Sequence, residues 1–150
     1  MLCGHRVRGF TLAETLMLLV VAGFLVGLAS YSWASARQGL ALRTATRQVM
    51  FDLMSARLRA VASNRNHRVI FPVGAASYQR QWRNGSVYTD LGGPIPLPRG
   101  IEVASCNAAG QAITYRPRGN AATFGTIVLR NQRGEERQVV VDIAGRVRVQ

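Results

Sequence analysis

Residues 8–29 read RGFTLAETLMLLVVAGFLVGLA, and this stretch decides how the chain begins to fold. A glycine and an aromatic residue separate a short basic leader from a long apolar run, in which Glu14 is the only ionisable residue. A run of this length can just cross a bilayer as a helix. Arg6 and Arg8 predict that the N-terminus stays on the cytoplasmic side and that the rest of the chain is exported.

Glu14 limits how this segment can be used. A carboxylate at the edge of an apolar run costs on the order of several kcal/mol unless it finds a partner. The terminal ammonium of a neighbouring copy would be such a partner, so the acid predicts an assembly contact. Thr11 to Glu14 also have the spacing of a helix capping box, which is compatible with assembly. A secretory cleavage site at Ala34-Ser35-Ala36 is the other interpretation, but it leaves Glu14 unexplained.

The composition fits one exported domain of modest size. Of the 150 residues, about a hundred remain for a globular head after the apolar segment, which is enough for a small core. Cys3 belongs to the leader, so Cys106 would be the single thiol of the processed chain. We interpret Cys106 as a small packed residue, and any further role of this thiol stays open.

The charge of the chain is strongly positive. Nineteen basic residues stand against seven acidic ones, and all nineteen are arginine. Removing Arg6 and Arg8 with the leader changes the net charge from +12 to +10, so the excess belongs to the exported part. A field of this sign favours polyanions such as nucleic acid or anionic lipid headgroups. The absence of lysine suits bidentate phosphate contacts, but a GC-rich genome would give the same bias.

Apolar residues at spacings of three and four predict that an amphipathic helix follows the apolar run. The stripe consists of Leu42, Ala45, Val49, Leu53, Ala56 and Ala60, widened by Met50, Met54, Leu58 and Val61. No proline interrupts residues 10–71, so one helix of about 55 residues is expected. The cluster Ser63-Asn64-Arg65-Asn66 is expected to end it.

From His67 onward the pattern changes to short strands separated by turn residues. The expected strands are 67–73, 77–83, 87–89, 101–104, 111–116, 123–130, 137–143 and 146–149. Asn84-Gly85 is a hairpin turn signal, and residues 91–100, with three prolines and three glycines, are expected to be loop. His67 is expected to be a strand-edge residue. The fold class is therefore α+β, with a long N-terminal helix packed on an antiparallel β-sheet.

The junction at Gly9-Phe10 resembles the processing site of type IV pilins and type II secretion pseudopilins. In that family an inner-membrane prepilin peptidase cuts after the glycine, here Gly9, and N-methylates the new terminus, here Phe10. The glutamate five residues into the processed chain, here Glu14, forms an ion pair with the N-terminal ammonium of a neighbouring subunit. The resemblance implies a cleaved leader 1–9, a transmembrane and filament-core helix 10–36, an amphipathic helix 37–64 and a β-rich periplasmic head 65–150.

Residues in the head indicate which group within this family the chain resembles. Residues 56–70, followed by Trp82-Arg83-Asn84-Gly85, look like the GspH/FimT group of minor pilins and pseudopilins. Some FimT-type proteins are associated with DNA capture through a C-terminal Gly-Arg-x-Arg motif, which Gly145, Arg146 and Arg148 match here. The implied partners are other major or minor pilins or pseudopilins, the prepilin peptidase and DNA. The implied location is the bacterial inner membrane and then a pilus or pseudopilus.

Strand geometry alone indicates that the C-terminal arginines can contact phosphate groups. In an extended segment, Arg146 and Arg148 lie on one face about 6.6 Å apart, close to one phosphate repeat, while two valines anchor the other face. Such a pair contacts phosphate rather than base sequence. Gly145 permits the backbone to turn towards the surface. If the last strands form a meander, further arginines extend the patch: Arg116, Arg118, Arg130, Arg133 and Arg137.

The inventory of reactive side chains does not predict an enzyme. His67 is the only histidine beyond the leader, and nothing near Cys106 in the sequence suggests a catalytic dyad. No metal-ligand cluster, phosphate-binding glycine loop or Ser-His-Asp set can be assembled from this sequence. No cofactor and no metal site are therefore expected.

The sequence thus predicts a minor type IV pilin of the FimT kind that binds extracellular DNA without sequence preference and supports natural transformation. The alternative is a structural subunit of the GspH kind, which primes assembly of a pilus or type II secretion pseudopilus without binding DNA. The two differ in whether the arginine-rich end of the head contacts DNA.

Overall fold

The computed structural model describes residues 11–150, except for the side chains of residues 29–38. The predicted leader, the predicted cleavage position Gly9 and the predicted methylation position Phe10 lie outside the described residues. The chain divides into two compact units, residues 1–36 and residues 37–150.

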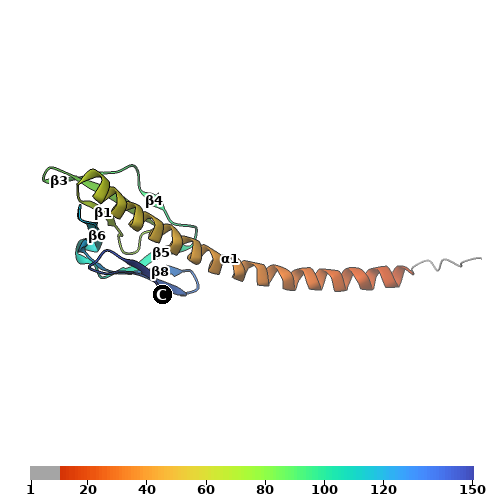
Figure 1. Ribbon diagram of the computed structural model, residues 1–150. Helices are drawn as coiled ribbons and strands as arrows, with labels where there is room; N and C mark the ends of the chain where they lie inside the picture. Colours follow the sequence, from red (N-terminus) through yellow and green to blue (C-terminus); the bar gives the residue numbers. More distant parts are fainter. Residues whose placement is uncertain (1–10) are drawn as a thin grey trace, which may run out of the picture. The chain divides into compact units, whose positions relative to one another are not determined.

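The long helix predicted from the sequence is α1 (Leu12–Ser63), shown in Figure 1. Thr11 caps its start, because the Glu14 amide donates to Thr11 O at 3.1 Å and lies 3.4 Å from Thr11 Oγ1. At the end of the helix, Asn64 adopts a φ of 51°. The Arg65 amide donates to Ala60 O, five residues earlier, at 3.2 Å. This left-handed cap, which asparagine tolerates, confirms the predicted end of the helix.

The described residues of the first unit present their side chains to solvent. Every side chain from Thr11 to Leu28 is exposed, and Glu14 lies in the first turn, where an acid suits the positive end of the helix dipole. Within the part of the chain that the structure describes, no helix combines the length and the apolar character needed to cross a membrane. The assignment of residues 10–36 as a membrane-spanning segment stays a prediction.

In the described residues, ten strands form two antiparallel sheets, where the sequence predicted one sheet. The first sheet has the order β3-β2-β1-β6-β7, with β4 also paired to β2. Its strands are β1 (His67–Ile70), β2 (Ser77–Asn84), β3 (Val87–Asp90), β4 (Ile95–Pro96), β6 (Ala112–Tyr115) and β7 (Ala121–Thr123). The second sheet has the order β10-β9-β8-β5. Its strands are β5 (Ile101–Cys106), β8 (Gly125–Asn131), β9 (Glu136–Val141) and β10 (Val147–Val149).

Most strand predictions are confirmed to within a few residues, but β7 was not predicted and the loop prediction for residues 91–100 is wrong in part. The predicted loop 91–100 contains the short strand β4, whose backbone pairs with the start of β2. His67 is the first residue of β1, at the edge of its strand as expected, and it pairs with both Trp82 and Tyr115 because β1 lies between β2 and β6. The hairpin predicted at Asn84-Gly85 joins β2 to β3 as expected.

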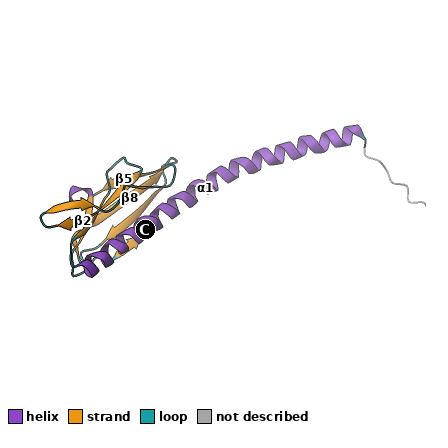
Figure 2. Cartoon of the chain, turned by 90° about the horizontal axis from the view of Figure 1, so that it is seen from above, coloured by secondary structure: helices purple, strands orange, loops and turns teal. Residues whose placement is uncertain are grey.

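The core of the head forms between the C-terminal part of α1 and the strands beside it (Figure 2). The predicted helix stripe is buried at all six positions, namely Leu42, Ala45, Val49, Leu53, Ala56 and Ala60. Met54, Leu58 and Val61, which were predicted to widen it, are 40%, 70% and 51% exposed. Every buried apolar residue in the described chain lies between Leu42 and Val141, within the compact unit 37–150, so we expect residues 37–150 to fold alone.

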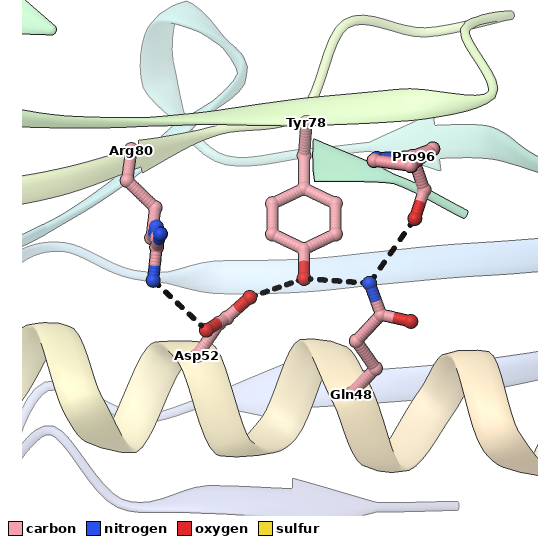
Figure 3. Close-up of polar contacts among 5 residues, drawn as sticks. All are labelled: Gln48, Asp52, Tyr78, Arg80 and Pro96. Carbon is pink, nitrogen blue, oxygen red and sulfur yellow. Dashed lines mark hydrogen bonds and ion pairs between the residues drawn. The ribbon is translucent and has the colours of Figure 1, made fainter. Parts of the chain in front are cut away.

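A polar network fastens the first sheet to α1 (Figure 3). The Tyr78 hydroxyl donates to the buried Asp52 carboxylate, which also forms an ion pair with Arg80 at 3.4 Å. Gln48 Nε2 donates to Tyr78 Oη at 3.2 Å and to Pro96 O at 3.1 Å, so the same helix face also holds β4. Burial, followed by the hydrogen bond to Asp52, raises the pKa of Tyr78, which keeps the hydroxyl protonated as a donor.

Candidate functional site

The candidate site is centred on the turn that joins β9 to β10. The Gly145 amide donates to Asp142 O at 2.9 Å, and the Arg146 amide donates to Asp142 Oδ1 at 2.8 Å. Gly145 has a φ of 78°, a conformation that glycine adopts without the strain that a side chain brings. The predicted turn at Gly145 is therefore confirmed, and it returns β10 antiparallel onto β9.

Gly145 is also buried against a second loop. A Cβ atom at this position would lie 2.4 Å from Gly119 O. That carbonyl accepts a hydrogen bond from Arg57 Nε of α1 at 2.7 Å. The Ala121 amide donates to Ile143 O at 3.1 Å. These contacts hold the β9–β10 turn against the loop that joins β6 to β7.

Arg146 and Arg148 are both exposed, as the strand geometry predicts. Arg148 pairs with Val140, so it lies on the outer face of the edge strand β10, and Arg146 immediately precedes that strand. On the opposite face Val147 packs against the core, whereas Val149 is 37% exposed. The anchoring of β10 by its valines is therefore confirmed for Val147 and only partial for Val149.

The contact between Gly119 and Gly145 brings further arginines to this end of the head. Arg116 and Arg118 lie in the β6–β7 loop and are exposed, and Arg118 immediately precedes Gly119. Arg146 immediately follows Gly145 in the facing turn. Within the described residues, the guanidinium groups of Arg116, Arg118, Arg146 and Arg148 form no ion pair or hydrogen bond. We name these four residues the C-terminal arginine cluster.

The other three predicted arginines lie elsewhere. Arg130 forms an exposed ion pair with Glu102 at 2.7 Å, and the hydrogen bond to Glu102 raises the pKa of Arg130. Arg133 lies in the β8–β9 hairpin, at the far end of β9 from Gly145. Arg137 shares its strand face with the buried Val139 and so points towards α1. The meander is confirmed, but the single extended patch is not, because strand alternation and antiparallel pairing separate its members.

Sequence reasoning gave no role to three arginines of α1. Arg57 fixes the position of the β6–β7 loop through Gly119 O. Arg43 and Arg47 lie beside Arg137 in a hollow against the second sheet. A sequence signal was present for Arg137 of β9, since it alternates in phase with Val139 and Val141 and must share their face. No sequence signal links Arg57 to a loop 62 residues away.

The two reactive side chains of the head are packed residues. Cys106 is half-buried at the end of β5 against the core, and burial raises the pKa of its thiol, which disfavours the reactive thiolate. His67 is buried, and its Nε2 lies 3.1 Å from Ser63 Oγ. Among residues 11–150 no three or more His, Cys, Asp or Glu side chains lie close enough together to hold a metal ion.

His67 predicts how the stability of the head depends on pH. Burial, followed by the charge of Arg59, lowers the pKa of His67 below its usual value of 6.5. The unfolded chain therefore binds this proton more readily than the folded chain does. The contribution of neutral His67 to the free energy of unfolding is complete above pH 6.5, and it is lost as the pH falls through the lowered pKa of His67. Urea unfolding of residues 37–150 between pH 8 and pH 5 should show a falling midpoint, and His67→Asn should flatten that dependence.

Comparisons with known proteins agree with this architecture. The family model described as type II transport protein GspH matches residues 45–145. The minor pseudopilin EpsH from the type 2 secretion system of Vibrio cholerae shares the fold with a TM-score of 0.60 and 12% identity, over 73% of this chain and 95% of that one. The type IV minor pilin FimU of Pseudomonas aeruginosa has a TM-score of 0.57 and 15% identity, over 73% and 87% of the two chains.

No curated protein matched the sequence. These two solved structures are named as a minor pseudopilin and a minor pilin, and at such low identity they support the fold alone. The family match covers more than half of the chain, from the buried part of α1 at Ala45 to Gly145. The chain therefore belongs to the GspH family of minor pilins and pseudopilins.

Proposed function

We propose that this minor pilin binds extracellular DNA without sequence preference through the C-terminal arginine cluster and thereby supports DNA uptake. One observation carries the proposal: four exposed guanidinium groups with no acidic partner are gathered around one glycine-to-glycine contact. Arginine binds phosphate oxygens bidentately, and unpaired arginines need break no ion pair to do so. Contacts of this kind read the phosphate backbone rather than the bases.

The proposal includes how the chain enters a filament. The leader is cut after Gly9, and Phe10 becomes the methylated terminus. Glu14 forms an ion pair with the terminal ammonium of a neighbouring subunit. The exposed apolar side chains of the first unit support this arrangement, because other subunits would cover them. Anchoring of residues 10–36 in the inner membrane before assembly stays a prediction from the sequence.

The second candidate function is structural. Membership of the GspH family supports a subunit that primes pilus or type II secretion pseudopilus assembly without binding DNA. The exposed side chains of Met54, Leu58 and Val61, which line a hollow of about 660 Å³ with Arg57 and Arg118, offer α1 a surface for contact with other subunits. This function predicts no more DNA affinity than any basic protein shows.

The deciding experiment is a titration of duplex DNA with residues 37–150 at several salt concentrations. The affinity should fall with salt on a log–log plot, with a slope of about 0.9 for each phosphate contact. In the double variant Arg146→Ala, Arg148→Ala, two contacts are lost, so the slope should decrease by about 1.8. Fluorescence anisotropy with two duplexes of unrelated sequence measures both the slope and the lack of sequence preference.

The matched control is the double variant Arg83→Ala, Arg99→Ala. It removes the same charge from two exposed arginines that lie outside the cluster. Equal slopes for the two double variants would contradict the site assignment. In a strain carrying Arg146→Ala and Arg148→Ala, lost transformation with intact filaments favours DNA capture, whereas lost filament or secretion output favours the structural function.

A further inference from the structure

A second cationic site lies on the opposite side of the edge strand β10 from Arg148. It is a hollow of about 390 Å³ between α1 and the second sheet. Its lining consists of Arg43, Thr46, Arg47, Met50, Arg137 and Val149. We name it the helix-side hollow.

Local geometry explains why its three arginines converge. Arg43 and Arg47 are one helical turn apart, so their side chains project from the same face of α1. Arg137 lies on the face of β9 that carries the buried valines, and that face is turned to α1. Two helical arginines and one strand arginine therefore meet across the hollow.

The positive charges in this hollow have no counter-charge. Within the described residues, none of the three guanidinium groups forms an ion pair or hydrogen bond. Glu136 lies on the other face of β9, and Asp52 is engaged by Tyr78 and Arg80. Like charges at this helical spacing repel each other, so an anion that enters the hollow relieves an existing repulsion.

The floor of the hollow strengthens such binding. Met50 and Val149 supply apolar surface. The Thr46 hydroxyl, which also lines the hollow, already donates its hydrogen bond to Leu42 O at 2.7 Å. An apolar floor reduces the number of waters that compete for the guanidinium groups and lowers the local dielectric constant. Because a water molecule takes about 30 Å³ of liquid, the hollow admits a phosphate group together with several waters.

We propose that the helix-side hollow binds a phosphate group of the DNA backbone, as a second contact beside the C-terminal arginine cluster. Val149 lines the hollow, and the preceding Arg148 projects from the other face of the same edge strand. A DNA backbone that passes over β10 therefore reaches both sites. The DNA assignment rests on the proposed function, whereas the capacity of the hollow for phosphate does not.

The test compares double variants of residues 37–150 in the salt-dependent titration of a 20-base-pair duplex. Arg43→Gln with Arg47→Gln should decrease the slope by about 1.8, because two phosphate-binding groups are removed. The charge-matched control, Arg83→Gln with Arg99→Gln, should leave the slope close to that of the unchanged protein. All four positions are exposed, so unfolding midpoints should agree among the variants.

An NMR titration with inorganic phosphate tests the hollow without DNA. Shifts of the Arg43, Arg47 and Arg137 Nε–H signals at lower phosphate concentration than those of Arg83 and Arg99 support the site. Equal responses of all five would overturn it.

Three outcomes separate this inference from the proposed function. A normal slope for the Arg43, Arg47 variant beside a reduced slope for the Arg146, Arg148 variant overturns the hollow and retains the C-terminal cluster. A reduced slope for the Arg43, Arg47 variant alone supports the hollow and overturns the C-terminal cluster. If the Arg43, Arg47 variant loses binding to phosphatidylglycerol vesicles but binds DNA normally, the DNA assignment of the hollow is overturned.

Discussion

Replacing Gly145 by alanine is expected to lower the free energy of unfolding of residues 37–150 by about 3 kcal/mol. Two effects add. A side chain at a φ of 78° costs about 1–2 kcal/mol through backbone strain. The new methyl group would also lie 2.4 Å from Gly119 O, and such overpacking costs about 1–3 kcal/mol. Urea unfolding measures the change, and a melting temperature lower by roughly 10 °C should accompany it.

Gly134→Ala is the control for this prediction. Gly134 has a φ of 80°, but a Cβ atom there would meet nothing within 4 Å. It should therefore cost only the backbone strain, about 1–2 kcal/mol. Equal losses in the two variants would show that the Gly119 contact contributes nothing.

This difference matters for the interpretation of the Gly-Arg-x-Arg motif. The glycine packs against Gly119 O, whereas the two arginines are exposed. Lost DNA binding in a Gly145 variant would therefore report damage to the turn, and only the arginine variants report contact with DNA.

The helix was predictable because its signals are local. Spacings of three and four identify the buried stripe from Leu42 to Ala60, and the polar cluster at Ser63–Asn66 marks the end. The division of the strands into two sheets was not predictable in this way. β5 follows β4 in the sequence but pairs with β8, and β1 pairs with β6 across at least 41 intervening residues, so partner choice depends on contacts distant in sequence.

The candidate site was likewise predictable where its signals are local and not where it depends on contacts between distant segments. Alternation along β10 places Arg148 on the outer face, and the glycine signal predicts the turn at Gly145. The contact of Gly145 with Gly119 and the ion pair of Arg130 with Glu102 join segments about two dozen residues or more apart, and nothing local encodes them. The true extent of the arginine cluster therefore required the structure.

The Asp52 network shows the same limit and leads to the second prediction. Tyr78 and Arg80 alternate in phase on β2, so the sequence places them on one face. It does not show that this face meets Asp52 of α1. The carboxylate accepts from Tyr78 and pairs with Arg80 in a site where its side chain is only 11% exposed.

Replacing Asp52 by alanine is expected to cost about 3 kcal/mol of unfolding free energy. Breaking a buried ion pair leaves the partner charge uncompensated, at about 3–5 kcal/mol, and the 28% exposure of Arg80 favours the lower end. Asp90→Ala is the matched control, because Asp90 is exposed and accepts only from Gln81, so its loss should stay within about 1 kcal/mol. Urea unfolding of residues 37–150 measures both variants.

A double-mutant cycle with Tyr78→Phe shows whether the network acts as a unit. Removing the hydroxyl alone should cost about 1–2 kcal/mol, because Asp52 keeps Arg80 as its partner. After Asp52→Ala that hydroxyl has already lost its acceptor, so the double variant should cost less than the sum of the two single changes. Strict additivity, or a loss below about 1 kcal/mol for Asp52→Ala, would show that apolar packing alone holds β2 against α1. The DNA affinity of the folded fraction should stay unchanged, since neither Asp52 nor Tyr78 belongs to the C-terminal arginine cluster.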